Sequence, residues 1–193
     1  VEKFPAEAQA FSHQVYIYLV LGLTAALCSF GLVSLLRWLL GSGGFNGFNI
    51  AFPLVWAGIW GYHWHVQNLN VQRTRIGATV RRVYVYITSL YSLFMLVFGV
   101  AIVIWRPLKE AYAALFTTQL LLSGDVGFWA SLWTDTTRTG VAILIVGGGL
   151  WWWHWHRAAK GDTDSMLRRV YLYLFAVLGG AATVVVTLSM VLF

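Results

Sequence analysis

Charged residues and cysteine are scarce in this chain of 193 residues. Asp, Glu, Lys and Arg make up 10% of the sequence, whereas a soluble domain has roughly 25%. This scarcity of charge, together with 59% hydrophobic residues, excludes a water-soluble globular protein and a disordered tail. The single cysteine, Cys28, excludes a disulfide framework and metal sites built from cysteine thiolates. We therefore expect a polytopic membrane protein.

Acidic residues are fewer than basic ones, 7 against 13, which gives a net charge of +6. The basic residues lie in short segments between long apolar runs and form no continuous patch. Such a distribution sets the orientation of membrane helices, so we expect no nucleic acid partner.

Signatures of catalysis are also missing. The sequence contains no P-loop, no Gly-x-Gly-x-x-Gly and no His-Glu-x-x-His motif. The apolar runs contain no acidic or basic side chain in their interiors, whereas proton relays and intramembrane proteases need ionisable groups at depth. We therefore expect no enzyme and no catalytic residues. The chain opens at Val1 without a signal-peptide pattern, and we expect a processed or incomplete form of a longer protein.

Five apolar segments are long enough to span a membrane. A bilayer core about 30 Å thick requires about 20 apolar residues per helix, and fewer where interfacial aromatic residues flank it. The sequence therefore predicts an all-α transmembrane bundle of five spans in a single membrane domain, 1–193. The predicted spans are 15–40, 50–64, 83–105, 140–155 and 170–193.

Two motifs repeat along the chain. Val-Tyr-x-Tyr opens the first, third and fifth predicted spans, at 15–18, 83–86 and 170–173. Trp-x-x-His-Trp-His closes the second and fourth, at 60–65 and 151–156. The repeating unit is therefore a helical hairpin, and its copies should be related by an axis along the membrane normal.

The repeats divide the chain as follows. We expect repeat 1 at 13–66, repeat 2 at 81–157, and half of a third repeat at 168–193. Repeat 2 contains an insertion, 107–139, that begins with a proline and continues with a helical pattern. We predict that this insertion forms one or two interfacial helices on the outer surface, with docking of another subunit as the alternative.

Arginines gather on one side of the predicted spans. The positive-inside rule therefore places the N-terminus in the cytoplasm. The paired arginines could also contact the phosphates of membrane lipids, and tryptophans beside them would anchor the helices at the interface. These lipid and interface residues are Arg81, Arg82, Arg168, Arg169, Trp64 and Trp155.

Four histidines in the two His-Trp-His endings are candidate cofactor ligands. Successive helical residues differ by about 100°, so His63 and His65 cannot bind one metal together. A twofold relation between hairpins would instead pair His63 with His154, or His65 with His156, as axial ligands of haem b or bacteriochlorophyll. One histidine as a single axial ligand is a further possibility. Tryptophan and histidine are also common at membrane interfaces, and we favour that structural role.

Arg-Arg-Val-Tyr-x-Tyr at the helix starts and the aromatic-His helix endings resemble a family of bacterial integral membrane proteins, frequent in Chloroflexota, known only as a domain of unknown function. The first copy differs, with His13 and Gln14 in place of the arginine pair. The resemblance implies a bacterial source and an inner-membrane location. It implies no activity, cofactor or partner.

We expect a non-catalytic subunit that packs against other membrane protein subunits in a larger complex. Glycine-rich stretches, 147–149 and 179–180, would allow close approach of helices. The alternative is a haem- or bacteriochlorophyll-binding protein, and a weaker alternative is a channel or small-solute carrier, whose selectivity would have to come from backbone carbonyls.

Overall fold

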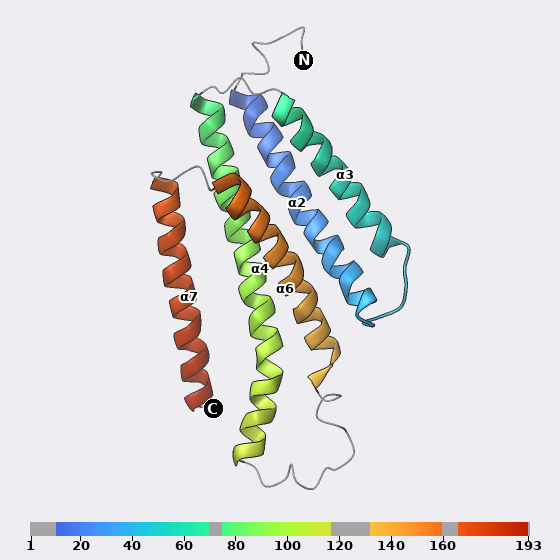
Figure 1. Cartoon of the computed structure of the whole chain (residues 1–193), viewed down its shortest axis with the longest axis vertical. Coiled ribbons are helices and arrows are strands. Elements are labelled where there is room, and N and C mark those ends of the chain that lie inside the picture. Colours follow the sequence, from blue (N-terminus) through green and yellow to red (C-terminus); the bar gives the residue numbers. More distant parts are fainter. Residues whose placement is uncertain (1–10, 70–74, 117–131, 160–165, 193) are drawn as a thin grey trace.

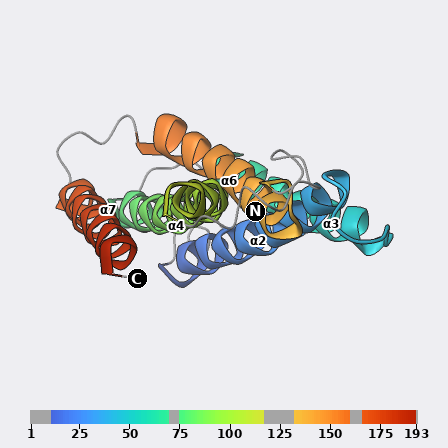
Figure 2. The same cartoon turned by 90° about the horizontal axis from the view of Figure 1, so that it is seen from below.

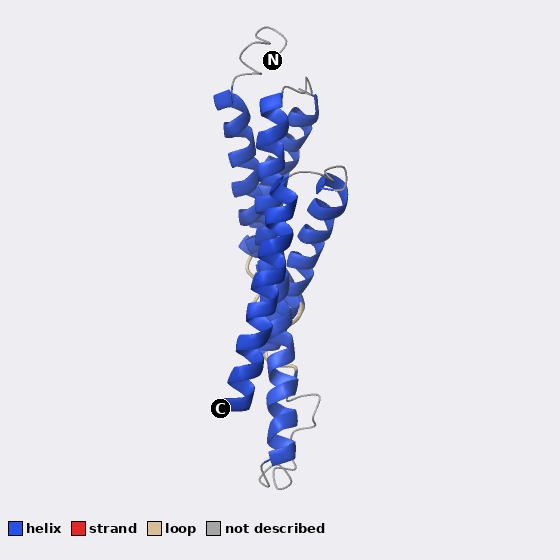
Figure 3. Ribbon diagram, turned by 90° about the vertical axis from the view of Figure 1, so that its left-hand side faces the viewer, coloured by secondary structure: helices blue, strands red, loops and turns tan. Residues whose placement is uncertain are grey.

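A computed structural model describes residues 11–69, 75–116, 132–159 and 166–192 (Figure 1). All of its regular structure in these ranges is helical (Figure 3). The helices are α2 (Phe11–Leu39), α3 (Phe48–Leu69), α4 (Arg75–Phe116), α6 (Asp135–Trp153), the π-helix η2 (His154–Ala159) and α7 (Met166–Leu192).

The described helices form a side-by-side bundle (Figure 1). α2 packs against α3, and α4 packs against α6, so that each of these pairs forms a hairpin-like unit. α4 also contacts α2 and α7. Figure 2 shows α4 surrounded by α7 on the left, α2 on the lower right and α6 above. α3 and α7 lie at opposite edges of the bundle (Figure 1).

Two of the described helical segments are long and apolar enough to cross a membrane. They are α2 and the part of α4 from Gly77 to Lys109. The predicted helical fold is thus confirmed for the described residues.

α2 ends with a glycine motif that closes its last turn. Gly41 has a φ of +85°, a conformation that glycine adopts without the steric cost of a side chain. The N–H of Ser42 donates to Arg37 O at 2.8 Å and the N–H of Gly41 donates to Trp38 O at 2.9 Å. Both bonds satisfy carbonyls that the helix end would leave open. The chain can therefore turn directly into the short connection to α3.

The insertion differs from the prediction at its start. Pro107 begins no separate helix, because it lies inside α4, which continues without interruption to Phe116. Proline removes one intrahelical hydrogen bond, but its fixed φ is compatible with a helix. The good helix formers Leu108, Lys109 and Ala111 then keep the chain helical. The predicted interfacial helices would otherwise fall mainly on 117–131, outside the described residues.

α6 begins five residues earlier than the predicted span. Thr134 is its N-cap, and its hydroxyl accepts the N–H of Thr137 at 3.3 Å. Near this cap, Arg37 of α2 donates to the Asp135 carboxylate at 3.3 Å. The pKa of the Asp135 carboxyl lies below its ordinary value because the nearby Ser42 hydroxyl and Arg37 guanidinium stabilise the charged form. The contact should therefore weaken only at acid pH, where the carboxylate becomes protonated.

Glycines bring α4 and α6 into backbone contact. A Cβ added at Gly147 would lie 2.6 Å from the backbone N of Leu96, and one at Gly99 would lie 2.6 Å from that of Leu144. Any side chain at these positions would force the helices apart. The expected close approach is confirmed at Gly147 but is wrong for Gly149, where an added Cβ would meet nothing within 4 Å.

Small polar residues line the contact between α2 and α4. The hydroxyls of Ser29 and Tyr91 lie 2.7 Å apart, and this bond joins the two helices. Thr24 and Ser92 are buried and donate to carbonyls of their own helices, Val20 O and Thr88 O, both at 2.7 Å. Their polar groups are thereby satisfied without any charge in the interior.

Gly147→Leu should destabilise the bundle, because the new side chain must displace the backbone of α4. We expect a loss of about 1–3 kcal/mol or more, seen as a fall in Tm of roughly 5 °C or more. Gly149→Leu is the matched control, and its Tm should stay close to that of the unsubstituted protein. Thermal unfolding in detergent measures both, and equal effects of the two substitutions would contradict this packing.

Candidate functional site

Aromatic and polar side chains from the five described α-helices and from η2 meet at one end of the bundle. α2, α4 and α7 begin at this end, and α3 and α6 finish there (Figure 1). The Val-Tyr-x-Tyr starts and the Trp-x-x-His endings are therefore brought to the same level. We call the resulting set the aromatic cluster. Its members are Tyr18, Trp60, Trp64, Tyr84, Tyr86, Trp151, His154, Trp155 and Tyr171.

Tyr84 is at the centre of a hydrogen-bonded chain in this cluster. Trp60 Nε1 lies 3.4 Å from the Tyr84 hydroxyl, which lies 3.2 Å from His154 Nε2. His154 Nδ1 lies 2.9 Å from the carbonyl oxygen of Leu150. The chain joins α3, α4 and the start of η2.

The partners fix the direction of these bonds. An indole N–H can only donate, and a carbonyl oxygen can only accept. Trp60 therefore donates to Tyr84, and His154 donates from Nδ1 to Leu150 O. In neutral His154, Nε2 is then an acceptor, and the Tyr84 hydroxyl donates to it. Each side-chain polar atom in this series of hydrogen bonds, from Trp60 to Leu150, has a partner.

Burial makes the hydrogen bonds from Trp60 through Tyr84 to His154 energetically important. His154 has an exposed fraction of 0% and Tyr84 one of 5%. A buried donor or acceptor without a partner costs roughly 1–3 kcal/mol. The pairing of Tyr84 with His154 therefore fixes the position of η2 on α4.

A similar contact joins α6 to α7. Trp151 Nε1 donates to the Tyr171 hydroxyl at 2.9 Å. The ring of Trp155 stacks on that of Tyr171 with centroids 5.1 Å apart. The centroid of the Tyr86 ring, on α4, lies 5.8 Å from that of Tyr171. Tyr171 thus holds the start of α7 against η2 and α4.

Tyr18 extends the cluster to α2. Its ring lies 5.5 Å from that of Tyr84, between centroids. Gln67 of α3 donates through Nε2 to the Tyr18 hydroxyl at 2.9 Å, and the same nitrogen lies 3.4 Å from Gln14 Oε1. These bonds connect α2 and α3 to the cluster.

The helix changes its hydrogen-bonding pattern at His154. α6 ends at Trp153, and the six residues of η2 continue as a π-helix. A π-helix widens the turn and is frequent at functional sites. Here the change begins at the residue whose side chain is bonded to α4.

The other candidate histidines have different environments. His63 is half-buried, and its Nδ1 lies 2.9 Å from Ile59 O. His65 and His156 are exposed, and the ring of His156 stacks on Trp152 with centroids 3.7 Å apart. The structure therefore gives the four histidines different environments, although they share the Trp-x-x-His-Trp-His pattern.

His154 does not fit an axial ligand of haem or bacteriochlorophyll in this arrangement. Both of its ring nitrogens have protein partners, and its side chain is fully buried. As an axial ligand, His154 would have to exchange the Tyr84 hydroxyl for the metal at Nε2, and the pairing of His63 with His154 stays a prediction. Within the described ranges, no group of three or more His, Cys, Asp or Glu side chains could hold a metal ion.

The predicted interface residues divide into two groups. Arg81, Arg82 and Arg169 are exposed near the starts of α4 and α7, and their contact with lipid stays a prediction. Arg168 is half-buried, with its guanidinium 5.9 Å from the centre of the Trp155 ring. Trp64 stacks on Trp60 at 5.3 Å. Trp64 and Trp155 therefore also pack in the aromatic cluster.

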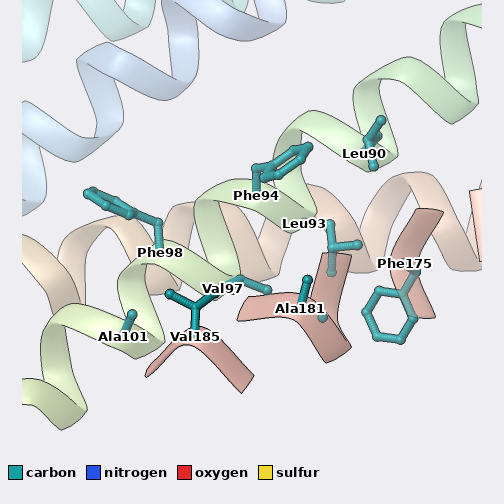
Figure 4. A pocket seen from close by; sticks show the side chains of 10 residues that line it. Leu90, Leu93, Phe94, Val97, Phe98, Ala101, Phe175, Ala181 and Val185 are labelled. Carbon is teal, nitrogen blue, oxygen red and sulfur yellow. The ribbon is translucent and has the colours of Figure 1, made fainter. Parts of the chain in front are cut away.

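Sequence reasoning missed an apolar groove between α4 and α7 (Figure 4). Its volume is about 450 Å³, and its wall contains no histidine. The feature of the sequence that indicates this groove is the row of apolar residues on one face of α4, from Leu90 to Ala101. The lining residues are Leu90, Leu93, Phe94, Val97, Phe98, Ala101, Phe175, Gly179, Ala181 and Val185.

Tyr84→Phe should lower stability, because it leaves the indole N–H of Trp60 and Nε2 of His154 without their partner. The expected loss is about 1–3 kcal/mol in the free energy of unfolding. Tyr16 holds the same motif position in α2 but is 58% exposed. Tyr16→Phe should change stability by less than about 0.5 kcal/mol. Unfolding in detergent compares the two variants. An unchanged free energy of unfolding in Tyr84→Phe would contradict the stabilising role of these hydrogen bonds.

Comparison with known proteins gives a partial match. The profile for a domain of unknown function (DUF5671) matches residues 112–193, which include α6, η2 and α7. No curated protein and no solved structure matches the chain. The part that is similar to this domain thus contains His154, Trp151 and Tyr171 but not Tyr84.

Proposed function

We propose that this chain is a non-catalytic, five-span subunit of a larger protein complex in a bacterial inner membrane. Besides α2 and α4, the helices α3, α6 and α7 have 22, 19 and 27 residues. At 1.5 Å per residue these lengths correspond to roughly 28–40 Å, comparable with a bilayer core of about 30 Å. This agreement supports five spans.

Recurring contacts support a tandem repeat of helical hairpins. Trp60 donates to Tyr84, and Trp151 donates to Tyr171, which holds the same motif position one repeat later. In the same way, His63 and His154 each place Nδ1 2.9 Å from the carbonyl oxygen four residues before. An axis along the membrane normal would relate such units, because α2, α4 and α7 start at the same end of the bundle.

The arginines favour a cytoplasmic position for the end that carries the aromatic cluster. In a Cys28→Ala background, a cysteine at Asn68 of α3 should react with a membrane-impermeant maleimide only after cell lysis. A cysteine at Gly44, in the connection between α2 and α3, should react in intact cells. Both positions are exposed. Labelling with the opposite pattern would reverse the proposed orientation.

Exposed small residues on α3 support the proposal that this chain binds a partner subunit. An added Cβ at Gly58 or Gly61 would meet nothing within 4 Å, and Ala57 and Gly58 are exposed. Small residues in membrane helices commonly allow another helix to approach closely. Gly31, Gly99 and Gly147, in contrast, contact neighbouring helices of the same chain. The free small-residue face of α3 thus supports packing against a helix of another subunit.

Gly58→Leu should disrupt such a complex without unfolding the chain. A Cβ at Gly58 meets nothing within 4 Å in the chain, but a leucine there would prevent close approach of a partner helix. We expect the membrane complex that contains the chain to shrink or dissociate on native gels, while the Tm of the purified chain stays nearly unchanged. Gly149→Leu on α6 is the matched control. A complex that keeps its size with Gly58→Leu would contradict this interface.

Binding of haem b or bacteriochlorophyll remains the second candidate function, and the environment of His154 limits it. The exposed pair His65 and His156, or His63 alone, would have to supply the axial nitrogen, since these side chains are accessible at least in part. A channel or carrier has less support, because Thr24 and Ser92 bond to their own helices and Ser29 bonds to Tyr91.

An absorption spectrum of the protein from its native membrane separates these candidates. A non-pigmented subunit should show no Soret band and no near-infrared chlorin band, in the oxidised or the dithionite-reduced state. A bound pigment that is lost in His65→Ala with His156→Ala, but kept in His154→Gln, would favour the second candidate and replace the first.

A further inference from the structure

The starts of α4 and α7 lie side by side, and both carry the Arg-Arg-Val-Tyr motif. The Tyr86 ring of α4 and the Tyr171 ring of α7 are in contact, with centroids 5.8 Å apart. About one helical turn before this contact are Arg82 on α4 and Arg168 on α7. Arg82 is exposed, and Arg168 is half-buried, with its guanidinium 5.9 Å from the centre of the Trp155 ring. The tyrosine contact therefore brings the two arginines to the same level of the bundle.

The apolar groove lies on the other side of the same contact. It is lined by Leu90 of α4, four residues after Tyr86, and by Phe175 of α7, four residues after Tyr171. Along α4 the lining continues to Ala101 (Figure 4). At about 1.5 Å per residue the groove is roughly 16 Å long, close to half of a bilayer core of about 30 Å. This is the depth of one leaflet, and hence of one acyl chain of a lipid.

In the proposed membrane position, the α4 wall of the groove is accessible to lipid. Phe94 and Phe98 line the groove and are 52% and 61% exposed. All of the lining residues are apolar. The volume of about 450 Å³ lies within the range of small-molecule sites, about 300–1,000 Å³. The groove therefore suits a hydrocarbon chain and offers no hydrogen bond to a polar ligand.

One arginine of each pair shares a helix face with the groove. Arg82 precedes the lining residue Leu93 by eleven residues, and Arg168 precedes Phe175 by seven. Both spacings return to nearly the same face of a helix. The other arginine of each pair is rotated by about 100° and lies on a different face. The described residues at this end of the bundle include no acidic side chain, so the charge beside the groove is positive.

We propose that the α4–α7 groove binds one anionic phospholipid of the surrounding bilayer, with the phosphate at Arg82 and Arg168 and an acyl chain along the groove. A guanidinium group donates paired hydrogen bonds to phosphate oxygens. Side chains near a helix start lean toward the N-terminus, which brings both guanidinium groups toward the headgroup level. A headgroup with a net negative charge is favoured over a zwitterionic one, because the positive field attracts it. The site rests on the proposed membrane position of α4 and α7 but requires no partner subunit.

Native mass spectrometry of the purified full chain, delipidated in detergent, tests the headgroup. Offered equal amounts of phosphatidylglycerol and phosphatidylcholine with identical acyl chains, the chain should retain phosphatidylglycerol. Arg82→Gln with Arg168→Gln should weaken this binding by roughly tenfold. Arg81→Gln with Arg169→Gln removes the same charge from the other faces and should weaken it by less than about threefold. Equal retention of the two lipids, or equal losses in the two double variants, would overturn the proposal.

Photoreactive benzoylphenylalanine in place of Phe94 tests what occupies the groove in the native membrane. Illumination should give an adduct with the mass of one anionic phospholipid, and its yield should fall several-fold with Arg82→Gln and Arg168→Gln. The same photoreactive residue in place of Tyr62 of α3, which is 66% exposed, reports on bulk lipid. Its adducts should not change with these arginine substitutions. Cross-linking from position 94 to a second copy or to another protein would assign the groove to a helix and overturn the proposal.

Alkaline extraction of the membranes separates a failure of this site from a failure of the proposed function. A chain that stays in the membrane pellet but shows no preference for phosphatidylglycerol would remove only the lipid site. Release of the chain into the supernatant would contradict the proposed membrane position itself.

Discussion

The bond between Tyr84 and His154 is the constraint on which the arrangement of this bundle depends. Both side chains are buried among apolar and aromatic residues, where an unpaired polar atom is costly. Because Trp60 donates to the same hydroxyl, the Tyr84 side chain of α4 connects α3 and η2 through hydrogen bonds. Tyr18 then adds α2 through its ring contact with Tyr84. The interior thus obtains specific positions for its helices from neutral hydrogen bonds, without any ion pair among these residues.

Glycine packing and the groove are two further results of side-chain size along α4. Gly99 allows α6 to contact the backbone of α4, and Gly147 does the same from the side of α6. On the face toward α7, α4 instead carries Leu90, Phe94 and Phe98, and a groove remains. α6 is therefore in backbone contact with α4, while Tyr171 holds the start of α7 against α4 and η2.

The helices could be predicted because long apolar runs and aromatic ends are strong signals in a sequence with so little charge. The different environments of the histidines could not be predicted, since His63 and His154 hold the same position in the Trp-x-x-His-Trp-His motif. Their environments differ because His154 meets Tyr84, while Tyr16, the residue at the same motif position in α2, is exposed. Pro107 does not mark a helix start, because α4 runs through it despite the hydrogen bond that proline removes, and good helix formers follow it. The groove depends on how far apart two helices lie, which local sequence does not specify.

The protonation pattern of His154 tests the central interaction most directly. Nitrogen NMR of ¹⁵N-histidine-labelled protein in lipid at neutral pH distinguishes the two neutral tautomers. The directed chain from Trp60 through Tyr84 predicts that His154 carries its proton on Nδ1, and that its Nε2 signal moves in Tyr84→Phe but not in Tyr16→Phe. A proton on Nε2, or a His154 signal that is unchanged by Tyr84→Phe, would contradict the account.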